Sequence, residues 1–221
     1  MSATLKELPS ALRTRQEEFD AAMTHGVAAV IAAIAGIHLV TEAVAKGDPW
    51  CVVGCAIYAV SMFCVFSAST LSHMYFPTRL HLRCRAYDQG FIYLLAVGSL
   101  SPFALTYLRT PLWMTFYAFS VTIAVAGFAS KVVFFHQLER ISLPLYLLQG
   151  WSQAVAIIPL SRILPAEAFG WILGGAICYC IGVVFLMLDI RRLNFHIVWH
   201  LMVVAACVCH YYAILWYCLL Y

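Results

Sequence analysis

Charged side chains are scarce in this chain of 221 residues: Asp, Glu, Lys and Arg together make up only 10% of it. Hydrophobic residues make up 64%, whereas a soluble domain has roughly 25% charged and 45–50% apolar residues. So few charges exclude an ordinary soluble domain and predict a protein that lies in a membrane. The formal net charge of +3 is also too small and too dispersed to indicate a nucleic-acid partner.

Neither paired cysteines nor a cleavable leader can be recognised in the sequence. The nine cysteines include no CxxC spacing, so they indicate neither a zinc knuckle nor a disulfide framework. Residues 1–20 are polar and lack an early apolar core, which argues against a signal peptide. Residues 4–20 have instead the pattern of an amphipathic helix that lies on the membrane surface.

Long apolar runs dominate the remainder of the chain, and each approaches the ~20 residues that cross a bilayer. Seven of them are predicted to be transmembrane helices: 21–45, 50–72, 88–108, 112–135, 141–160, 167–188 and 195–221. The loops between them are short, so neighbouring helices should be antiparallel in one compact bundle. The predicted fold is an all-α seven-helix membrane protein, with 1–20 as a cytoplasmic or interfacial segment and 21–221 as one transmembrane domain.

The basic residues predict an orientation for this bundle. If the N-terminus is cytoplasmic, inside segments hold ten of them: Lys6, Arg13, Arg15, Arg79, Arg83, Arg85, Lys131, Arg140, Arg191 and Arg192. The outside loops then hold only Lys46, Arg109 and Arg162. Because cytoplasmic loops carry an excess of Lys and Arg, we expect a cytoplasmic N-terminus and an outside C-terminus.

This topology places four ionisable residues that are distant in sequence at one depth. His73 ends the second span, Asp88 begins the third, and His196 and His200 begin the seventh, all near the predicted cytoplasmic edge. His196 and His200 are four residues apart and so share a helix face, roughly 6 Å apart. Ionisable groups within a membrane are costly without partners and by default indicate function.

Three histidines and one open position form the arrangement of a catalytic zinc site. The predicted ligands are His73, His196 and His200, with water or a substrate oxygen in the fourth position. Asp88 is the candidate catalytic group that handles the proton of that water, and Ser69, one turn before His73, is a candidate for orienting a ligand. Imidazole also suits copper, iron and nickel, and histidines at span ends can be interfacial residues without any chemistry.

The remaining polar residues near the span ends give less specific signals. His25 and His210 are candidate accessory residues of the site, although His25 can equally be a cap or an interfacial residue. His210 lies ten residues beyond the last ligand, roughly 15 Å along a helix, so a hydrogen-bonded histidine between helices is the favoured interpretation. Glu17 and Glu18 can pair with His25 or with Arg191 and Arg192, although solvated charges are the favoured interpretation. We expect His81 to lie in a loop.

A series of motifs runs through nearly the whole chain. It comprises Glu17-Glu18 with Thr24-His25-Gly26, residues 68–73, residues 87–103, residues 147–151, residues 195–201 and Cys209-His210. In composition and order the series resembles the hemolysin III family, the bacterial branch of the progestin and adipoQ receptors. The resemblance implies seven helices, a cytoplasmic N-terminus and a zinc ion held by the three matching histidines. Ser72 departs from the usual tyrosine before His73, which leaves the substrate open.

The resemblance also implies a function. A Ser-x3-His, an Asp and an HxxxH are shared with a wider group that includes the alkaline ceramidases, and receptors of the family are suspected lipid hydrolases. The first hypothesis is therefore a zinc-dependent hydrolase of lipid amide or ester bonds, with membrane lipids as partners, acting in lipid homeostasis in the bacterial inner (cell) membrane. The alternative is a non-enzymatic regulator or receptor with structural zinc. A pore-forming cytolysin is disfavoured because spans four to six offer no polar stripe.

Overall fold

The computed structural model describes residues 15–133, 145–146, 148–150, 153–190 and 195–220. Helices make up most of this part of the chain. Six of these helices are long and apolar enough to cross a membrane, and the described ranges contain no β-strand. The all-α class predicted from the sequence is confirmed.

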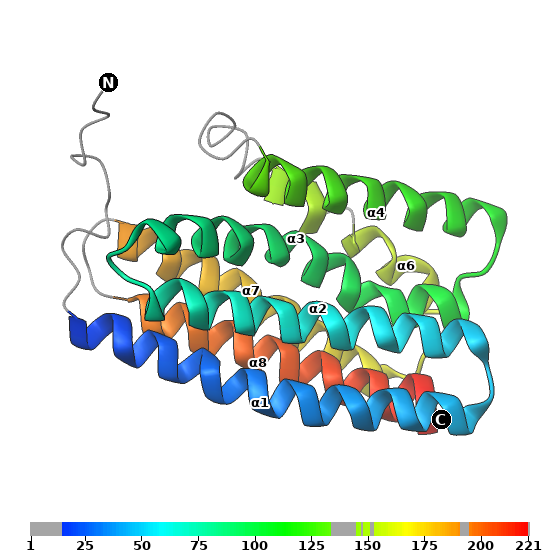
Figure 1. Cartoon of the computed structure of the whole chain (residues 1–221). Helices are drawn as coiled ribbons and strands as arrows, with labels where there is room; N and C mark the ends of the chain where they lie inside the picture. Colours follow the sequence, from blue (N-terminus) through cyan, green and yellow to red (C-terminus); the bar gives the residue numbers. More distant parts are fainter. Residues whose placement is uncertain (1–14, 134–144, 147, 151–152, 191–194, 221) are drawn as a thin grey trace.

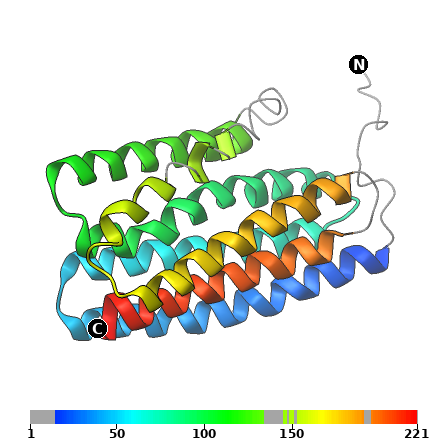
Figure 2. The same ribbon diagram turned by 180° about the vertical axis from the view of Figure 1, so that it is seen from behind.

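The helices follow the order of the predicted spans (Figure 1). Their bounds are α1 (Arg15–Lys46), α2 (Pro49–Met74), α3 (Arg79–Tyr107), α4 (Pro111–Val132), α6 (Ile157–Leu160), α7 (Ala166–Ile190), α8 (His196–Ile214) and the π-helix η4 (Leu215–Leu220). The helix α2 packs against both α1 and α3, α8 packs against α7 and α1, and α4 packs against α3. Figure 2 shows from behind that α7 lies along α8 while α4 stands apart from both. The bundle therefore brings the end of α2 beside the start of α8.

Large apolar side chains cover much of the outside of this bundle. They include Val30, Ile34, Ile37, Val60, Leu112 and Val133, each more than half exposed. Small and hydroxylated residues such as Ser61, Ser99, Ser101 and Ser120 are instead buried between the helices. A surface of this kind is stable against lipid tails and costly against water.

Glycines allow neighbouring helices to approach closely. A methyl group on Gly54 of α2 would lie 2.8 Å from the Cα atom of Pro102 on α3, so the two backbones are in contact there. On α7, a methyl group on Gly175 would lie 2.6 Å from Nε2 of His210 on α8. Gly175 therefore allows α7 and α8 to pack closely at this point.

Two helix starts differ from the predicted boundaries. The helix α3 begins at Arg79, nine residues before Asp88, because the Thr78 hydroxyl caps it by accepting a hydrogen bond from the backbone N–H of His81. The prediction that His81 lies in a loop is therefore wrong, since this residue is buried in the first turn of α3. Residues 15–20 are already part of α1, so the predicted division at residue 20 falls inside a helix. The rest of the predicted amphipathic segment, 4–14, lies outside the described residues.

The described ends of the chain lie at opposite ends of the bundle (Figure 1). The helix α4 stops at the end where α1 begins, and α7 starts at the other end, with 133–165 between them in the sequence. The predicted fifth span, 141–160, falls in this stretch and lies partly outside the described residues, with α6 as its last described part. The count of seven helices remains a prediction.

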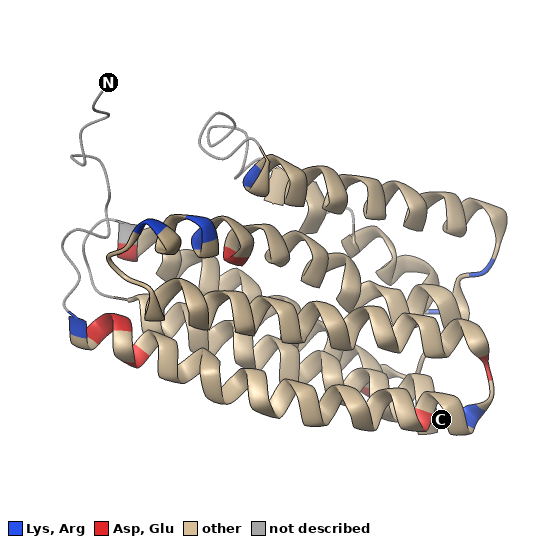
Figure 3. Ribbon diagram, viewed as in Figure 1, with Lys and Arg blue, Asp and Glu red and all other residues tan. Residues whose placement is uncertain are grey.

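Charged residues gather at the two ends of the bundle (Figure 3). The end where α1 begins also holds the first turns of α3 and the last turn of α4, and with them Arg15, Arg79, Arg83, Arg85 and Lys131. The opposite end holds Lys46, Arg109 and Arg162, of which Arg109 pairs with Asp48. The described basic residues therefore lie at the two ends to which the predicted topology assigned them. The cytoplasmic location of the N-terminus remains a prediction.

Candidate metal centre

Three predicted ligands meet at the end of the bundle where α1 begins. His73 lies in the last turn of α2, and His196 and His200 lie in the first turns of α8. One ring nitrogen from each lies within 4.8 Å of the other two, an arrangement that could hold a metal ion. Nε2 of His73 and Nε2 of His196 are 3.2 Å apart, close to the ~3.3 Å between two nitrogens of a tetrahedral zinc site.

Helix geometry accounts for this convergence. His196 and His200 are one turn apart on α8, and their ring centroids are 4.5 Å apart. The ring of His73 lies 5.0 Å from both, because α2 ends beside the start of α8. His73 and His200 are buried and His196 is partly exposed, so the centre is most accessible on the side of His196.

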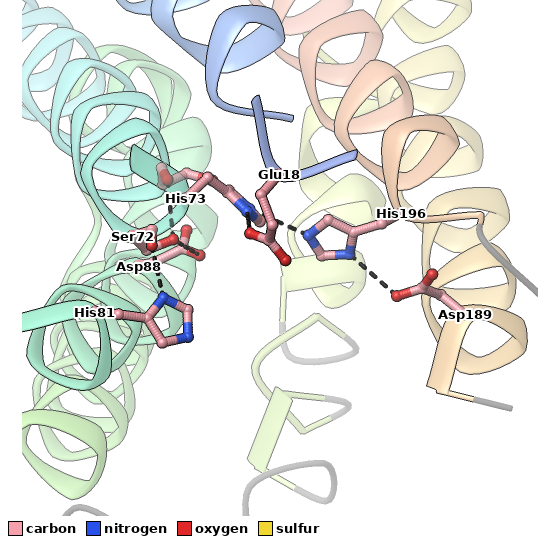
Figure 4. A network of polar contacts seen from close by, with 8 residues as sticks. Glu18, Ser72, His73, His81, Asp88, Asp189 and His196 are labelled. Carbon is pink, nitrogen blue, oxygen red and sulfur yellow. Dashed lines mark hydrogen bonds and ion pairs between the residues drawn. The ribbon is translucent and has the colours of Figure 1, made fainter. Parts of the chain in front are cut away.

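Carboxylates contact the Nδ1 atoms of two of these histidines (Figure 4). Oε2 of Glu18, on α1, lies 2.6 Å from Nδ1 of His73. Oδ2 of Asp189, near the end of α7, lies 3.3 Å from Nδ1 of His196. An ionised carboxylate can only accept hydrogen bonds, so Nδ1 of His73 carries its proton toward Glu18, whereas Nδ1 of His196 lies at ion-pair distance from Asp189 without a hydrogen bond. In the neutral ring of His73, Nε2 then presents a lone pair toward Nε2 of His196.

This arrangement of nitrogens fits a metal ion. Nε2 of His196 lies 3.2 Å from the atom that carries this lone pair, and a second lone pair at that distance would repel the first unless a cation or a proton lies between the two atoms. Neutral imidazoles are ligands that zinc, copper, iron and nickel accept. Within the described residues, the group that can hold an ion consists of the three histidines alone.

The two carboxylates were not predicted as parts of the site. The prediction of a solvated Glu18 is wrong, since this residue is only 4% exposed. It lies seven residues before His25, which is two helical turns, and therefore on the same face of α1. The helical spacing of the buried positions of α1, namely Glu18, Ala21, Ala22, His25, Ala28, Ala29 and Ala32, is the signal that could have identified it. Asp189 lies just past the predicted sixth span and has no comparable pattern around it.

Asp88 lies beside the three histidines and outside their ligand group. It is partly buried on α3, and the hydroxyl of Ser72 donates a hydrogen bond of 3.4 Å to its Oδ2 atom. Ser69 also faces this carboxylate, without a hydrogen bond of good geometry, and His73 interacts with it electrostatically. The structure thus brings Asp88 and Ser69 to the predicted place, and their roles remain predictions.

His81 links the helix of Asp88 to the helix of His73. Its Nδ1 atom lies 2.6 Å from the backbone carbonyl oxygen of Ser72, and a carbonyl can only accept, so Nδ1–H donates. The contact ties the first turn of α3 to the last turn of α2 (Figure 4). It therefore helps to hold Asp88 at the level of the histidines.

The two accessory candidates have different surroundings. The ring of His25 stacks on the ring of His200, with centroids 3.7 Å apart and planes 8° apart. Its Nε2 atom lies 3.4 Å from the carbonyl oxygen of His200, so His25 contacts a predicted ligand directly. His210 is deeper in the bundle, stacked on Tyr179 with centroids 5.8 Å apart. Its Nδ1 atom is buried without a hydrogen-bond partner among the described residues, so at this atom the expected hydrogen bond is missing.

Comparison with known proteins assigns the family. A family model described as Haemolysin-III related matches residues 13–211. The chain belongs to this family. A protein named Hemolysin-3 from Bacillus cereus is 34% identical over 204 residues, which cover 92% of this chain and 93% of the relative. The Hemolysin-3 homolog of Bacillus subtilis (strain 168) is 29% identical over 206 residues, 93% of this chain and 96% of the relative.

The similarity of this haemolysin-III-related protein extends beyond bacteria. The human Monocyte to macrophage differentiation factor is 26% identical over 190 residues, which cover 84% of this chain and 78% of the relative. The resemblance drawn from the motifs is therefore confirmed. Family membership and six apolar helices together make the chain an integral membrane protein, and its bacterial relatives make the inner (cell) membrane its location.

Proposed function

We propose that this haemolysin-III-related protein is a zinc-dependent membrane hydrolase that cleaves amide or ester bonds of lipids. The observation that supports this proposal most is the meeting of three imidazoles from α2 and α8 beside the carboxylate of Asp88. Zinc is the metal we favour, because it has no redox demand and accepts three histidines with an open position. Lipids surround this centre at the predicted cytoplasmic end of the bundle.

In this proposal the residues of the chain have separate roles. His73, His196 and His200 hold the ion through one ring nitrogen each. Zinc in such a place supplies a Lewis acid that polarises a carbonyl group and makes water acidic near neutral pH. Asp88 takes the proton of the attacking water and returns it to the leaving amine or alcohol. Ser72 lies 3.4 Å from Oδ2 of Asp88, and its single hydroxyl proton is shared between that carboxylate and the carbonyl oxygen of Ser69 at 2.9 Å.

An apolar groove between α2 and α3 favours a lipid as the substrate. It has a volume of about 220 Å³, and its lining includes Phe63, Ser67, Leu71, Cys84, Tyr87 and Phe91. Two of these residues, Leu71 and Tyr87, are direct chain neighbours of Ser72 and Asp88. Leu71 and Tyr87 are 43% and 44% exposed, so the groove opens toward the lipid, where an acyl chain can bind.

Metal analysis of the detergent-purified protein tests the first part of the proposal. We expect close to one zinc ion per chain in the wild type and a loss of most of it in His196→Ala. His38→Ala is the matched control, because His38 is a histidine of α1 that contacts Tyr211 outside the centre. A wild type that binds no zinc would refute the metal site.

The catalytic part is tested with Asp88→Asn, which keeps the shape of the side chain and removes its basicity. We expect this variant to retain its zinc and to lose ~10²–10⁴-fold in lipid turnover, measured by untargeted lipid analysis of proteoliposomes. Turnover equal to that of the wild type would exclude Asp88 as the catalytic group.

A structural zinc ion in a non-enzymatic receptor or regulator is the second candidate. It is favoured by the four helices that meet at the centre, since the histidines and their carboxylates come from α1, α2, α7 and α8. A wild type that holds zinc, melts at a lower temperature after chelation and turns over no lipid would support this candidate over the hydrolase.

A further inference from the structure

Two helices that supply no predicted ligand reach the metal centre through their carboxylates. We infer that Glu18 of α1 and Asp189 of α7 are positioning residues for the metal: Glu18 fixes the proton and the ring direction of His73, and the charge of Asp189 orients the ring of His196. This inference rests on the proposed zinc site and deepens it. It assigns a role in metal affinity to two residues that do not bind the ion.

The contact of Glu18 carries most of this inference. Its carboxylate lies 2.6 Å from Nδ1 of His73, and both side chains are almost fully buried, at 4% and 3% exposure. A buried carboxylate is costly unless a partner compensates its charge. A strong hydrogen bond at Nδ1 keeps the proton on that atom, turns Nε2 toward His196 and makes it a better electron donor.

Asp189 makes a weaker contact, an ion pair without a hydrogen bond. It lies 3.3 Å from Nδ1 of His196, with side-chain exposures of 5% for Asp189 and 16% for His196. The third predicted ligand, His200, has the stacked ring of His25 against its own ring. The rings of all three ligands are therefore oriented by neighbours from α1 or α7, and we expect Glu18 to have a larger effect than Asp189.

The same contacts can also be interpreted without a metal ion, and an experiment has to distinguish this interpretation from the positioning role. A protonated His73 could pair with Glu18 and donate from Nε2 to His196 at the observed 3.2 Å. In that case the carboxylate would stabilise the fold and have no effect on metal affinity. The two interpretations predict different zinc affinities, and this difference decides between them.

The test measures zinc affinity by competition with a chelator, on the full chain purified in detergent. The variants are Glu18→Gln and Asp189→Asn, which keep the size of each side chain and remove its charge. We expect ~10–100-fold weaker zinc binding in Glu18→Gln and a loss at the lower end of this range in Asp189→Asn. Glu17→Gln is the matched control, because it removes a charge from the same turn of α1, and its affinity should equal that of the wild type.

The melting temperature of the zinc-free proteins completes the test. Weaker zinc binding with an unchanged zinc-free melting temperature supports the inference, because a purely structural role would lower the melting temperature instead. Zinc affinities within twofold of the wild type in both variants would overturn the inference and leave the metal site standing. If Glu18→Gln does not fold, the affinity of Asp189→Asn decides. A wild type without zinc would overturn the proposed function and this inference together.

Discussion

Replacement of Gly54 by alanine should destabilise the contact between α2 and α3 without affecting the metal centre. The added methyl group would lie 2.8 Å from the Cα atom of Pro102 and 2.8 Å from the carbonyl oxygen of Ser101. Ordinary contacts begin at 3.4 Å, so the helices would have to separate by about half an ångström. Both obstructing atoms belong to the backbone, and no side chain can move aside to make room.

The magnitude follows from two opposing effects. Overpacking of a tightly packed interface costs ~1–3 kcal/mol, and alanine is intrinsically ~1 kcal/mol more favourable than glycine in a helix. Because the obstructing backbone is rigid, we expect the cost to lie near its upper limit, which leaves a net loss of ~2 kcal/mol. Gly54 precedes His73 by 19 residues on α2, which is roughly 28 Å along the helix axis. Zinc content should therefore stay at the wild-type level.

The assay is thermal unfolding of the detergent-solubilised protein together with metal analysis. Gly170→Ala is the control, because no heavy atom of the described residues would lie within 4 Å of its new methyl group. We expect Gly54→Ala to melt several degrees below the wild type and Gly170→Ala to melt at the same temperature or higher. Equal melting temperatures for Gly54→Ala and the wild type would refute the close contact.

Two further predictions concern the metal and one buried hydrogen bond. Chelation should lower the melting temperature of the wild type but not of His200→Ala, since free zinc at 100 times its Kd stabilises the folded protein by ~2.7 kcal/mol; an equal response of both proteins would count against a bound ion. Tyr58→Phe removes the hydroxyl that donates to the carbonyl oxygen of Cys207 at 2.7 Å, between α2 and α8. We expect a loss of ~1 kcal/mol with unchanged zinc content, and a melting temperature equal to that of the wild type would contradict this bond.

The spans could be predicted from the sequence because the membrane imposes its own length on each of them. Six apolar stretches were expected where α1, α2, α3, α4, α7 and α8 are found. The boundaries were less predictable, since a helix continues past the apolar region when a capping residue allows it. Thr78 starts α3 well outside the expected span, and this early start buries His81 against the end of α2.

The ligands of the centre could be predicted more easily than the residues around them. His196 and His200 are linked by helical spacing, and topology alone brings His73 to their level. Glu18 is one of several charges in a polar segment of the sequence, and only the structure shows that it is buried, at 4% exposure. Whether a charged side chain faces solvent or a neighbouring helix depends on how the helices rotate against each other, which no short motif determines.

Two features could be predicted without coordinates: the chain crosses a membrane as helices, and certain histidines lie at a common depth. Both follow from local properties, namely the length of apolar runs and the rise of a helix per residue. The approach of Glu18 and Asp189 to the Nδ1 atoms of His73 and His196 is visible only in the folded bundle. These contacts join four helices, so they depend on packing details such as the glycines that let helices approach.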